Sequence, residues 1–140
     1  ALARDIEARS ARVRAAAEAR HAAGHAPVRW AYLIWRAPWM AVNADTFVHA
    51  LLAQAGGVNV LADAPTRYPE VDAAALRAAD PDVVLLSSEP FPFAERHADE
   101  LAEATGLPRE RFVLCDGELL SWHGARTPEG IDYAARLLQG

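Results

Sequence analysis

The sequence predicts an α/β fold: a Rossmann-like domain whose central parallel sheet is flanked by helices and preceded by one long helix. Two observations support this fold class. After Pro27, short apolar runs of strand length alternate with segments of helical period. The clearest run, residues 83–87, is almost entirely apolar, which is typical of a strand covered on both faces. Such strands are expected to be parallel and joined by right-handed crossovers.

The first predicted element is a helix over residues 1–23, rich in Ala, Arg and Glu. Gly24 and Pro27 end it. Its apolar residues recur near helical spacing and form one narrow stripe: Leu2, Ile6, Val13 and Ala17. A helix with so narrow a stripe needs another surface to lie against.

Four strands are expected, at residues 30–34, 58–61, 83–87 and 112–115. Asp45 is expected to cap a helix that runs to Ala55 and stops at Gly56. Asp72 is expected to cap a short helix that ends at Asp80, before a proline.

Two further helices complete the pattern. The first ends at Gly106 and turns four residues inward: Phe93, His97, Leu101 and Ala104. The second starts with Thr127 as its cap and has Pro128 at its first helical position.

Composition narrows the function classes. The net charge of −5 argues against a nucleic-acid partner. No apolar run approaches the roughly 20 residues that a bilayer-spanning helix needs, so no membrane insertion is expected. Cys115 is alone, which excludes an internal disulfide and predicts a small buried side chain. No resident cofactor or metal is expected.

Four loops follow the carboxyl ends of the predicted strands, where open parallel sheets bind ligands. They are residues 35–40, 65–69, 88–93 and 116–126. Six of the eleven aromatic residues fall in them, together with Arg36, Arg67 and Arg126. Aromatic side chains beside Arg and Pro indicate a preformed, partly apolar binding face. The alternative is that each aromatic packs on the domain's own core, as Trp30 and Phe47 are expected to do.

An enzyme is the first alternative function, because Asp116, Glu118 and His123 share one loop. They could form an acid/base or metal group, but no ligand spacing, nucleophile elbow or phosphate-binding loop accompanies them. The other four histidines are interpreted as surface residues, His97 despite its inward period: His21, His25, His49 and His97. A second alternative is an interaction module whose aromatic edge meets a protein partner.

Three segments resemble a known family: residues 31–40, residues 68–90 and residues 116–122. The middle one carries the motifs Tyr-Pro-x-Val, from Tyr68, and Asp-Pro-Asp-Val, from Asp80. Together they resemble the C-terminal lobe of the helical-backbone class of substrate-binding proteins, which serve cobalamin, heme and ferric-siderophore importers. The resemblance covers about two thirds of the chain.

This resemblance implies two α/β lobes joined by a long rigid helix, with the cargo held between them. Residues 1–25 would be the end of that helix and residues 26–140 the C-terminal lobe, with the N-terminal lobe absent from this chain. The implied location is periplasmic or extracytoplasmic, and a lipid anchor on the missing part stays open. The cleft wall would comprise eight residues: Trp35, Arg36, Trp39, Tyr68, Glu89, Phe91, Trp122 and Arg126.

The implied partner is the permease of an ABC importer, and here the sequence departs from the family. Relatives place a Glu on the helix after Tyr-Pro-x-Val, where it pairs with an Arg of the permease. Ala74 occupies that position in this chain. Glu70 and Asp72 are the candidate replacements.

The cargo predicted first is cobalamin, since a wide aromatic wall with few charges suits a bulky neutral corrinoid. Heme would need an axial ligand, and Tyr68, His123 and Met40 are available. A ferric siderophore would depend on three cations: Arg36, Arg67 and Arg126.

Overall fold

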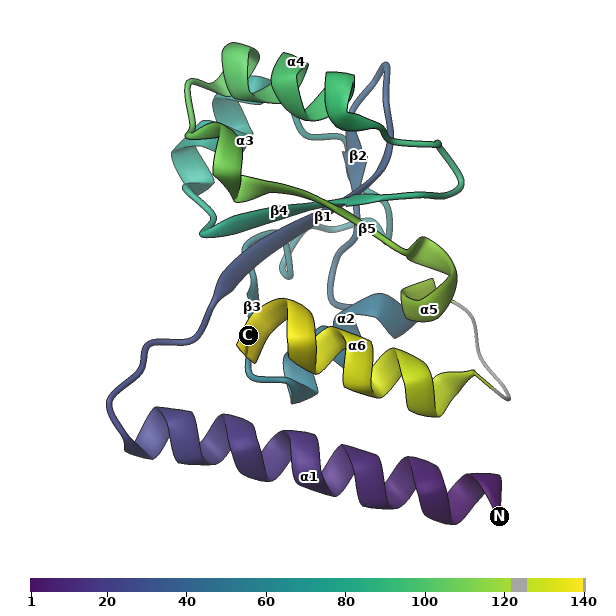
Figure 1. Ribbon diagram of the computed structural model, residues 1–140. Helices are drawn as coiled ribbons and strands as arrows, with labels where there is room; N and C mark the ends of the chain where they lie inside the picture. The colour runs from purple at the N-terminus through teal and green to yellow at the C-terminus, as the bar shows by residue number, and fades with distance from the viewer. Residues whose placement is uncertain (122–125, 140) are drawn as a thin grey trace.

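The computed structural model describes residues 1–121 and 126–139 (Figure 1). Its helices are α1 (Leu2–Ala22), α2 (Phe47–Gln54), α3 (Ala73–Ala79), α4 (Glu95–Thr105), α5 (Gly117–Ser121) and α6 (Thr127–Gln139), with a 3₁₀ turn at Arg109–Arg111. Its strands are β1 (Arg29–Trp35), β2 (Met40–Ala41), β3 (Val58–Asn59), β4 (Val83–Ser87) and β5 (Phe112–Cys115). Trp122 and His123 lie outside the described residues.

The strands form one sheet in the order β2-β1-β4-β5, with β3 also paired to β1. The pairs β1–β4, β4–β5 and β1–β3 are parallel, which confirms the predicted α/β class. The sheet also contains a strand that was not predicted, because the two-residue β2 pairs antiparallel to β1 at one edge. β2 and β3 each pair with a different part of the β1 edge that β4 leaves open, so β3 is shorter than the predicted strand 58–61.

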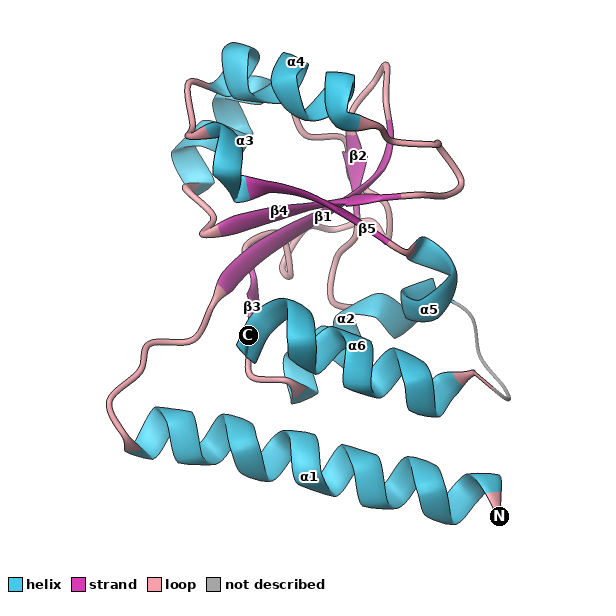
Figure 2. Cartoon of the chain, viewed as in Figure 1, coloured by secondary structure: helices cyan, strands magenta, loops and turns pink. Residues whose placement is uncertain are grey.

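Helices cover both faces of the sheet, and Figure 2 shows them in two groups. Alternate residues of β1 serve the two sides: Trp30 and Tyr32 belong to the core under α2 and α6, while Ala31 and Leu33 belong to the core under α3 and α4. All four are fully buried, as expected for a central strand of a covered sheet.

Helix α1 lies outside α6 and runs beside it (Figure 1). Val13 is its buried residue, and Arg9 forms an ion pair with Asp132 of α6. At the other end of α6, the Gln139 amide donates to the carbonyl of Val13 at 3.4 Å and to that of Ala55 at 2.9 Å. The predicted narrow stripe therefore does rest on another surface, although Leu2 stays exposed.

Two helix starts test the predicted caps. Asp72 is confirmed, since its carboxylate accepts a hydrogen bond from the backbone N–H of Ala75 at 2.7 Å. Asp45 is wrong: the hydroxyl of Thr46 accepts from the N–H of His49 at 3.1 Å and is the cap of α2.

Three smaller corrections follow from packing. Ala104 is exposed and Thr105 takes the buried position near the end of α4, because its hydroxyl donates to the carbonyl of Leu101 at 2.6 Å. Phe47 is only partly buried, at the rim of the core. Helix α5 was not predicted, since its five residues are too few for a period. Within the described ranges, no helix is both long and apolar enough to span a membrane.

Candidate ligand-binding cleft

A cavity of about 750 Å³ lies at the carboxyl edge of the sheet, as the strand-end rule predicts. Ile34, the last residue but one of β1, lines it, together with Glu89 and Pro90, which follow β4. The opposite side is formed by the start of α2, including Phe47, and by Tyr68. Both Tyr68 and Glu89 were predicted as wall residues, and the structure brings them to one cavity.

Tyr68 stands on a segment that is held to the sheet by backbone hydrogen bonds. The N–H of Ala41 donates to the carbonyl of Pro69 at 2.9 Å, and the N–H of Asn43 donates to that of Arg67 at 3.0 Å. Tyr68 itself is 48% exposed. A large aromatic side chain on a fixed backbone, half open to solvent, can stack on a flat ligand without reorganising the fold.

Glu89 is positioned by a buried hydroxyl. The Ser87 hydroxyl at the end of β4 donates to the carbonyl of Glu89 at 2.6 Å, and the Tyr32 hydroxyl donates to Ser87 at 3.0 Å. Gly117 packs directly against the Ser87 hydroxyl, and a larger residue would not fit there, because a Cβ at this position would lie 2.1 Å from the Ser87 oxygen. Sequence reasoning did not single out Ser87, although a polar residue that ends an apolar strand was the available signal.

Three other predicted wall residues, Trp35, Trp39 and Phe91, gather with Phe93 on the far side of β1 from the cavity. The Trp35 ring meets Phe91 edge-on at 5.7 Å, and Phe91 meets Phe93 at 4.8 Å. Trp39 stacks on Phe93 at 6.2 Å. We call these four rings with His97 the aromatic cluster; Trp35, 41% exposed, is its outermost ring. Ile34 and Trp35 are successive residues of a strand and therefore face opposite ways, which separates the cluster from the cavity.

His97 is the centre of the aromatic cluster, and its prediction as a surface residue is wrong. Its side chain is only 5% exposed, between Phe91 at 5.0 Å and Phe93 at 5.7 Å. Its Nδ1 accepts a hydrogen bond from the backbone N–H of Ala94 at 2.9 Å. Burial, followed by repulsion from Arg96 and Arg36, lowers the pKa of His97.

His49 is also less exposed than predicted. Its ring lies 5.9 Å from that of Trp30, and its Nδ1 is 3.3 Å from the Asn59 amide nitrogen. Burial lowers the pKa of His49.

The three arginines predicted to meet an anionic cargo are each engaged by carboxylates of this chain. Arg36 pairs with Glu100 at 2.7 Å, and Arg67 pairs with Asp45 at 3.0 Å. Arg126 pairs with two carboxylates, Glu118 at 2.8 Å and Glu129 at 3.2 Å, and lines none of the cavities described here. In each case the hydrogen bond to a carboxylate is the first cause of a raised arginine pKa.

Asp116 and Glu118, two members of the alternative acid/base group, already have partners in this chain. The Asp116 carboxylate accepts from the N–H of Glu118 at 2.9 Å and so starts α5, while Glu118 pairs with Arg126. His123 lies outside the described residues. The described part of the chain contains no group of three or more His, Cys, Asp or Glu that could hold a metal. Cys115 is buried as predicted, and burial raises its pKa to about 12.

The two candidate docking acids differ in whether the side chain already has a structural role. Glu70 is exposed, and its backbone bridges to Met40. The Asp72 carboxylate is the cap of α3. Ala74 is exposed at the second position of that helix.

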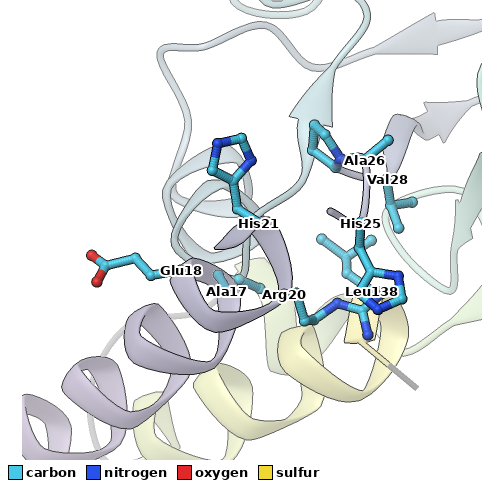
Figure 3. A pocket seen from close by; sticks show the side chains of 11 residues that line it. Ala17, Glu18, Arg20, His21, His25, Ala26, Val28 and Leu138 are labelled. Atoms are coloured by element: carbon cyan, nitrogen blue, oxygen red, sulfur yellow. The ribbon is translucent and has the colours of Figure 1, made fainter. Parts of the chain in front are cut away.

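A second cavity, of about 300 Å³, lies where the end of α1 meets α2 and α6 (Figure 3). Its walls are mainly small and apolar, among them Ala17, Val28 and Leu138, with His21 and His25 at the rim. Figure 3 shows Glu18 pointing away from it. Its place against the connecting segment before β1 separates it from the carboxyl edge.

Comparison with solved structures identifies the fold. The match to the periplasmic vitamin B12 binding protein BtuF of Vibrio cholerae has 18% sequence identity and a TM-score of 0.71, and covers 95% of this chain and 50% of BtuF. The match to the periplasmic heme-binding protein RhuT from Roseiflexus sp. RS-1, in apo form, has 25% identity and a TM-score of 0.75, and covers 97% of this chain and 52% of RhuT. An ABC-type Fe3+-hydroxamate transport system protein from Saccharomonospora viridis gives 20% identity, a TM-score of 0.72 and coverages of 96% and 47%.

The chain has the fold of one lobe of a periplasmic binding protein. It spans about half the length of these solved structures, as one lobe should. The resemblance found in the loop motifs is thereby confirmed at the level of the fold. No protein-family model matches the sequence, and a search of curated proteins gives no match.

Proposed function

We propose that this periplasmic-binding-protein lobe is one wall of the cargo cleft of an extracytoplasmic solute-binding protein that serves an ABC importer. The observation that carries the proposal is the cavity of about 750 Å³ at the carboxyl edge, with Tyr68 half exposed on it, in a fold shared with vitamin B12-, heme- and iron-binding proteins. Binding and release, without chemistry, are the activity that such a wall supports.

The proposed domain organisation treats residues 1–25 as the end of the helix that joins two lobes and residues 26–140 as the C-terminal lobe. In support, α1 is a separate layer outside α6, and its start lies on the same side of the domain as α5 (Figure 1). A preceding lobe on that side would face the carboxyl edge and enclose the cargo between two walls.

Tyr68 and Glu89 form the inner part of the proposed wall, and the aromatic cluster forms its outer rim beside β1. Cobalamin is the proposed cargo. The cavity is bordered by apolar groups such as Ile34 and Phe47, and the arginine nearest to Tyr68, Arg67, is already paired with Asp45. A broad, nearly neutral ligand fits these conditions better than an anionic ferric siderophore.

Heme is the second candidate, on one observation. The phenol of Tyr68 stands on the cavity wall, where it could serve as an axial ligand to iron. The other two residues considered for this role support it less: Met40 belongs to β2, and His123 lies outside the described residues.

The test is a titration of the full reading frame that contains this chain with cyanocobalamin, hemin and a ferric hydroxamate. Tryptophan fluorescence and the visible spectrum of each ligand report binding. One ligand is expected to bind saturably, and Tyr68→Ala is expected to weaken it at least tenfold as a central aromatic contact. Val58→Ala, an equally exposed apolar residue on β3, is the control. No saturable binding by a folded protein overturns the proposal.

Tyr68→Phe separates the two leading cargos. It removes only the hydroxyl, so cyanocobalamin binding should be retained and the iron–phenolate absorption of bound hemin should disappear.

For docking to the permease, Glu70 is the proposed acid, since the Asp72 carboxylate is already the cap of α3. Glu70→Gln should reduce transport without changing cargo affinity.

A further inference from the structure

A third cavity, of about 550 Å³, lies beside the aromatic cluster and has a different chemistry from the cleft. Five residues line it: Arg36, Phe91, Arg96, His97 and Glu100. Figure 1 shows the loop between β1 and β2 rising beside α4, and the Arg36–Glu100 pair joins these two elements there. Two guanidinium groups and one imidazole thus meet a single carboxylate.

His97 supplies a polar atom without a partner at this cavity. The ring is 5% exposed, and its Nδ1 is used by the N–H of Ala94. With Nδ1 accepting, the neutral ring carries its proton on Nε2, which makes no hydrogen bond within the described residues. Among those residues, the indole N–H of Trp30 is the one fully buried side-chain polar atom that lacks a partner. Nε2 of His97 also lacks a partner but is not fully buried, so it keeps contact with the cavity that His97 lines.

Arg96 supplies an uncompensated charge. Two acids of α4 close to it in sequence, Glu95 and Asp99, both pair with Arg109 instead. Within the described ranges Arg96 has no ion-pair partner. Glu100 is held at two points by Arg36, so the four charged or polar groups of the cavity leave one net positive charge.

The position of these groups in α4 adds to the argument. Arg96 and His97 lie in the first turn of an eleven-residue helix, whose backbone dipole already concentrates positive charge there. Acidic residues are favoured at such positions, as Glu95 is, and the cation Arg96 departs from this rule. Departures of this kind are expected where a ligand supplies the missing charge.

We infer that Arg96 and His97, backed by Arg36, form a subsite for an oxyanion carried by an arm of the cargo. The inference rests on the proposed function for the source of the oxyanion. The subsite adjoins the cleft through one loop: Phe91 lines it, while Glu89 and Pro90 line the main cavity. The N–H of Phe91 donates to the carbonyl of Ile34 at 3.2 Å, which holds this loop across the end of β1. The cavity and the subsite therefore lie on opposite faces of β1 and meet at its carboxyl end, so an arm of a cargo over Tyr68 would reach the subsite around this end, past Trp35.

Two kinds of cargo carry such a group: cobalamin through its phosphodiester, and heme through its carboxylates. Both present negatively charged oxygens that a guanidinium can bind at two points and an imidazole N–H can meet at a third.

The first experiment needs no cargo. Inorganic phosphate is titrated into the full reading frame while the ring nitrogens of His97 are followed by NMR. We expect a saturable shift of Nε2, and about tenfold weaker binding in Arg96→Gln, which removes one charge-assisted contact. Arg4→Gln, an exposed arginine of α1 without an ion pair among the described residues, should bind phosphate as the parent does. An Arg96→Gln protein that titrates like the parent overturns the inference.

The second experiment identifies the source of the oxyanion. Cyanocobalamin is compared with cobinamide, which lacks the phosphodiester, and with hemin. If cobalamin is the cargo, Arg96→Gln should weaken cyanocobalamin binding about tenfold and leave cobinamide binding unchanged. If hemin is the cargo, the same variant should weaken hemin binding instead. Cargo that binds equally to parent and Arg96→Gln overturns the subsite alone, whereas phosphate binding without any cargo binding overturns the proposed function alone.

Discussion

Arg36 and Glu100 form a two-point ion pair that joins the end of β1 to the middle of α4. Nε of Arg36 donates to one carboxylate oxygen at 2.8 Å and Nη2 donates to the other at 2.7 Å. The same guanidinium lies 5.7 Å from the centre of the Trp39 ring. The outer rim of the proposed wall is therefore held in place by the chain itself, with Arg36 as a support for the rim more than as a direct contact to cargo.

This pair predicts the titration of Glu100. The hydrogen bond from Arg36 is the first cause that lowers the pKa of Glu100. In Arg36→Gln that pKa should rise toward the ordinary value of a glutamate, as measured by carboxyl carbon NMR. The pair stabilises the fold above the pKa of Glu100 in the unfolded chain, and its contribution is lost as the pH falls through the lower folded value. A Glu100 pKa that is unchanged in Arg36→Gln would contradict the pairing.

The start of α2 gives a second prediction. Thr46→Ala removes the acceptor for the N–H of His49 and should lower the free energy of unfolding by about 1 kcal/mol. Asp45→Ala is the matched control, since the Asp45 side chain is exposed and lies outside the cap. Urea denaturation of both proteins measures the difference. Equal losses, or a larger loss in Asp45→Ala, would restore Asp45 as the cap.

The fold could be predicted where the signal is local. Strands β4 and β5 match the expected ranges because each is an apolar run between helix-ending residues, such as Asp80 before one and Gly106 before the other. The antiparallel β2 has two residues and no periodicity, and its partner is chosen by the free edge of β1. The cap of α2 was misplaced because Asp45 and Thr46 are both good capping residues and only the backbone geometry decides between them.

The site could be predicted less well, for a geometric reason. The strand-end rule predicts a cavity at the carboxyl edge, and two of the four loops, residues 65–69 and 88–93, line it, but aromatic residues of different loops face opposite sides of the sheet. Trp35 and Tyr68 are both half exposed, yet one belongs to the aromatic cluster and the other to the cavity. Ion pairs such as Arg36 with Glu100 join residues 64 positions apart, and no local pattern reveals them.

Gly57, between α2 and β3, tests the packing beneath the sheet. A Cβ at this position would lie 2.5 Å from a methyl carbon of Leu138 and 2.6 Å from the Trp30 ring. Both neighbours are buried, so Gly57→Ala should lower the free energy of unfolding by about 1–3 kcal/mol through overpacking. In a Leu138→Ala background the added methyl meets less resistance, and the double variant should lose less than the sum of the single losses. If the two losses of unfolding free energy are strictly additive, the added methyl group at position 57 does not collide with Leu138.

His97 predicts a dependence of stability on pH. Burial is the first cause that lowers its pKa below the ordinary 6.5, and Arg96 and Arg36 lower it further, against an opposing effect of Glu100. Below pH 6.5 the unfolded chain protonates His97 before the folded protein does, so the unfolded state binds more protons. The contribution of His97 to stability is complete above pH 6.5 and falls as the pH drops toward the folded pKa.

The variant His97→Gln tests this dependence. It keeps an acceptor for the N–H of Ala94 but does not titrate, so its free energy of unfolding should fall less than that of the parent between pH 7 and pH 5. His49 and the carboxylates act in both proteins, and the difference between the two urea-denaturation profiles isolates His97. A His97→Gln profile parallel to the parent would show that His97 does not titrate differently on folding.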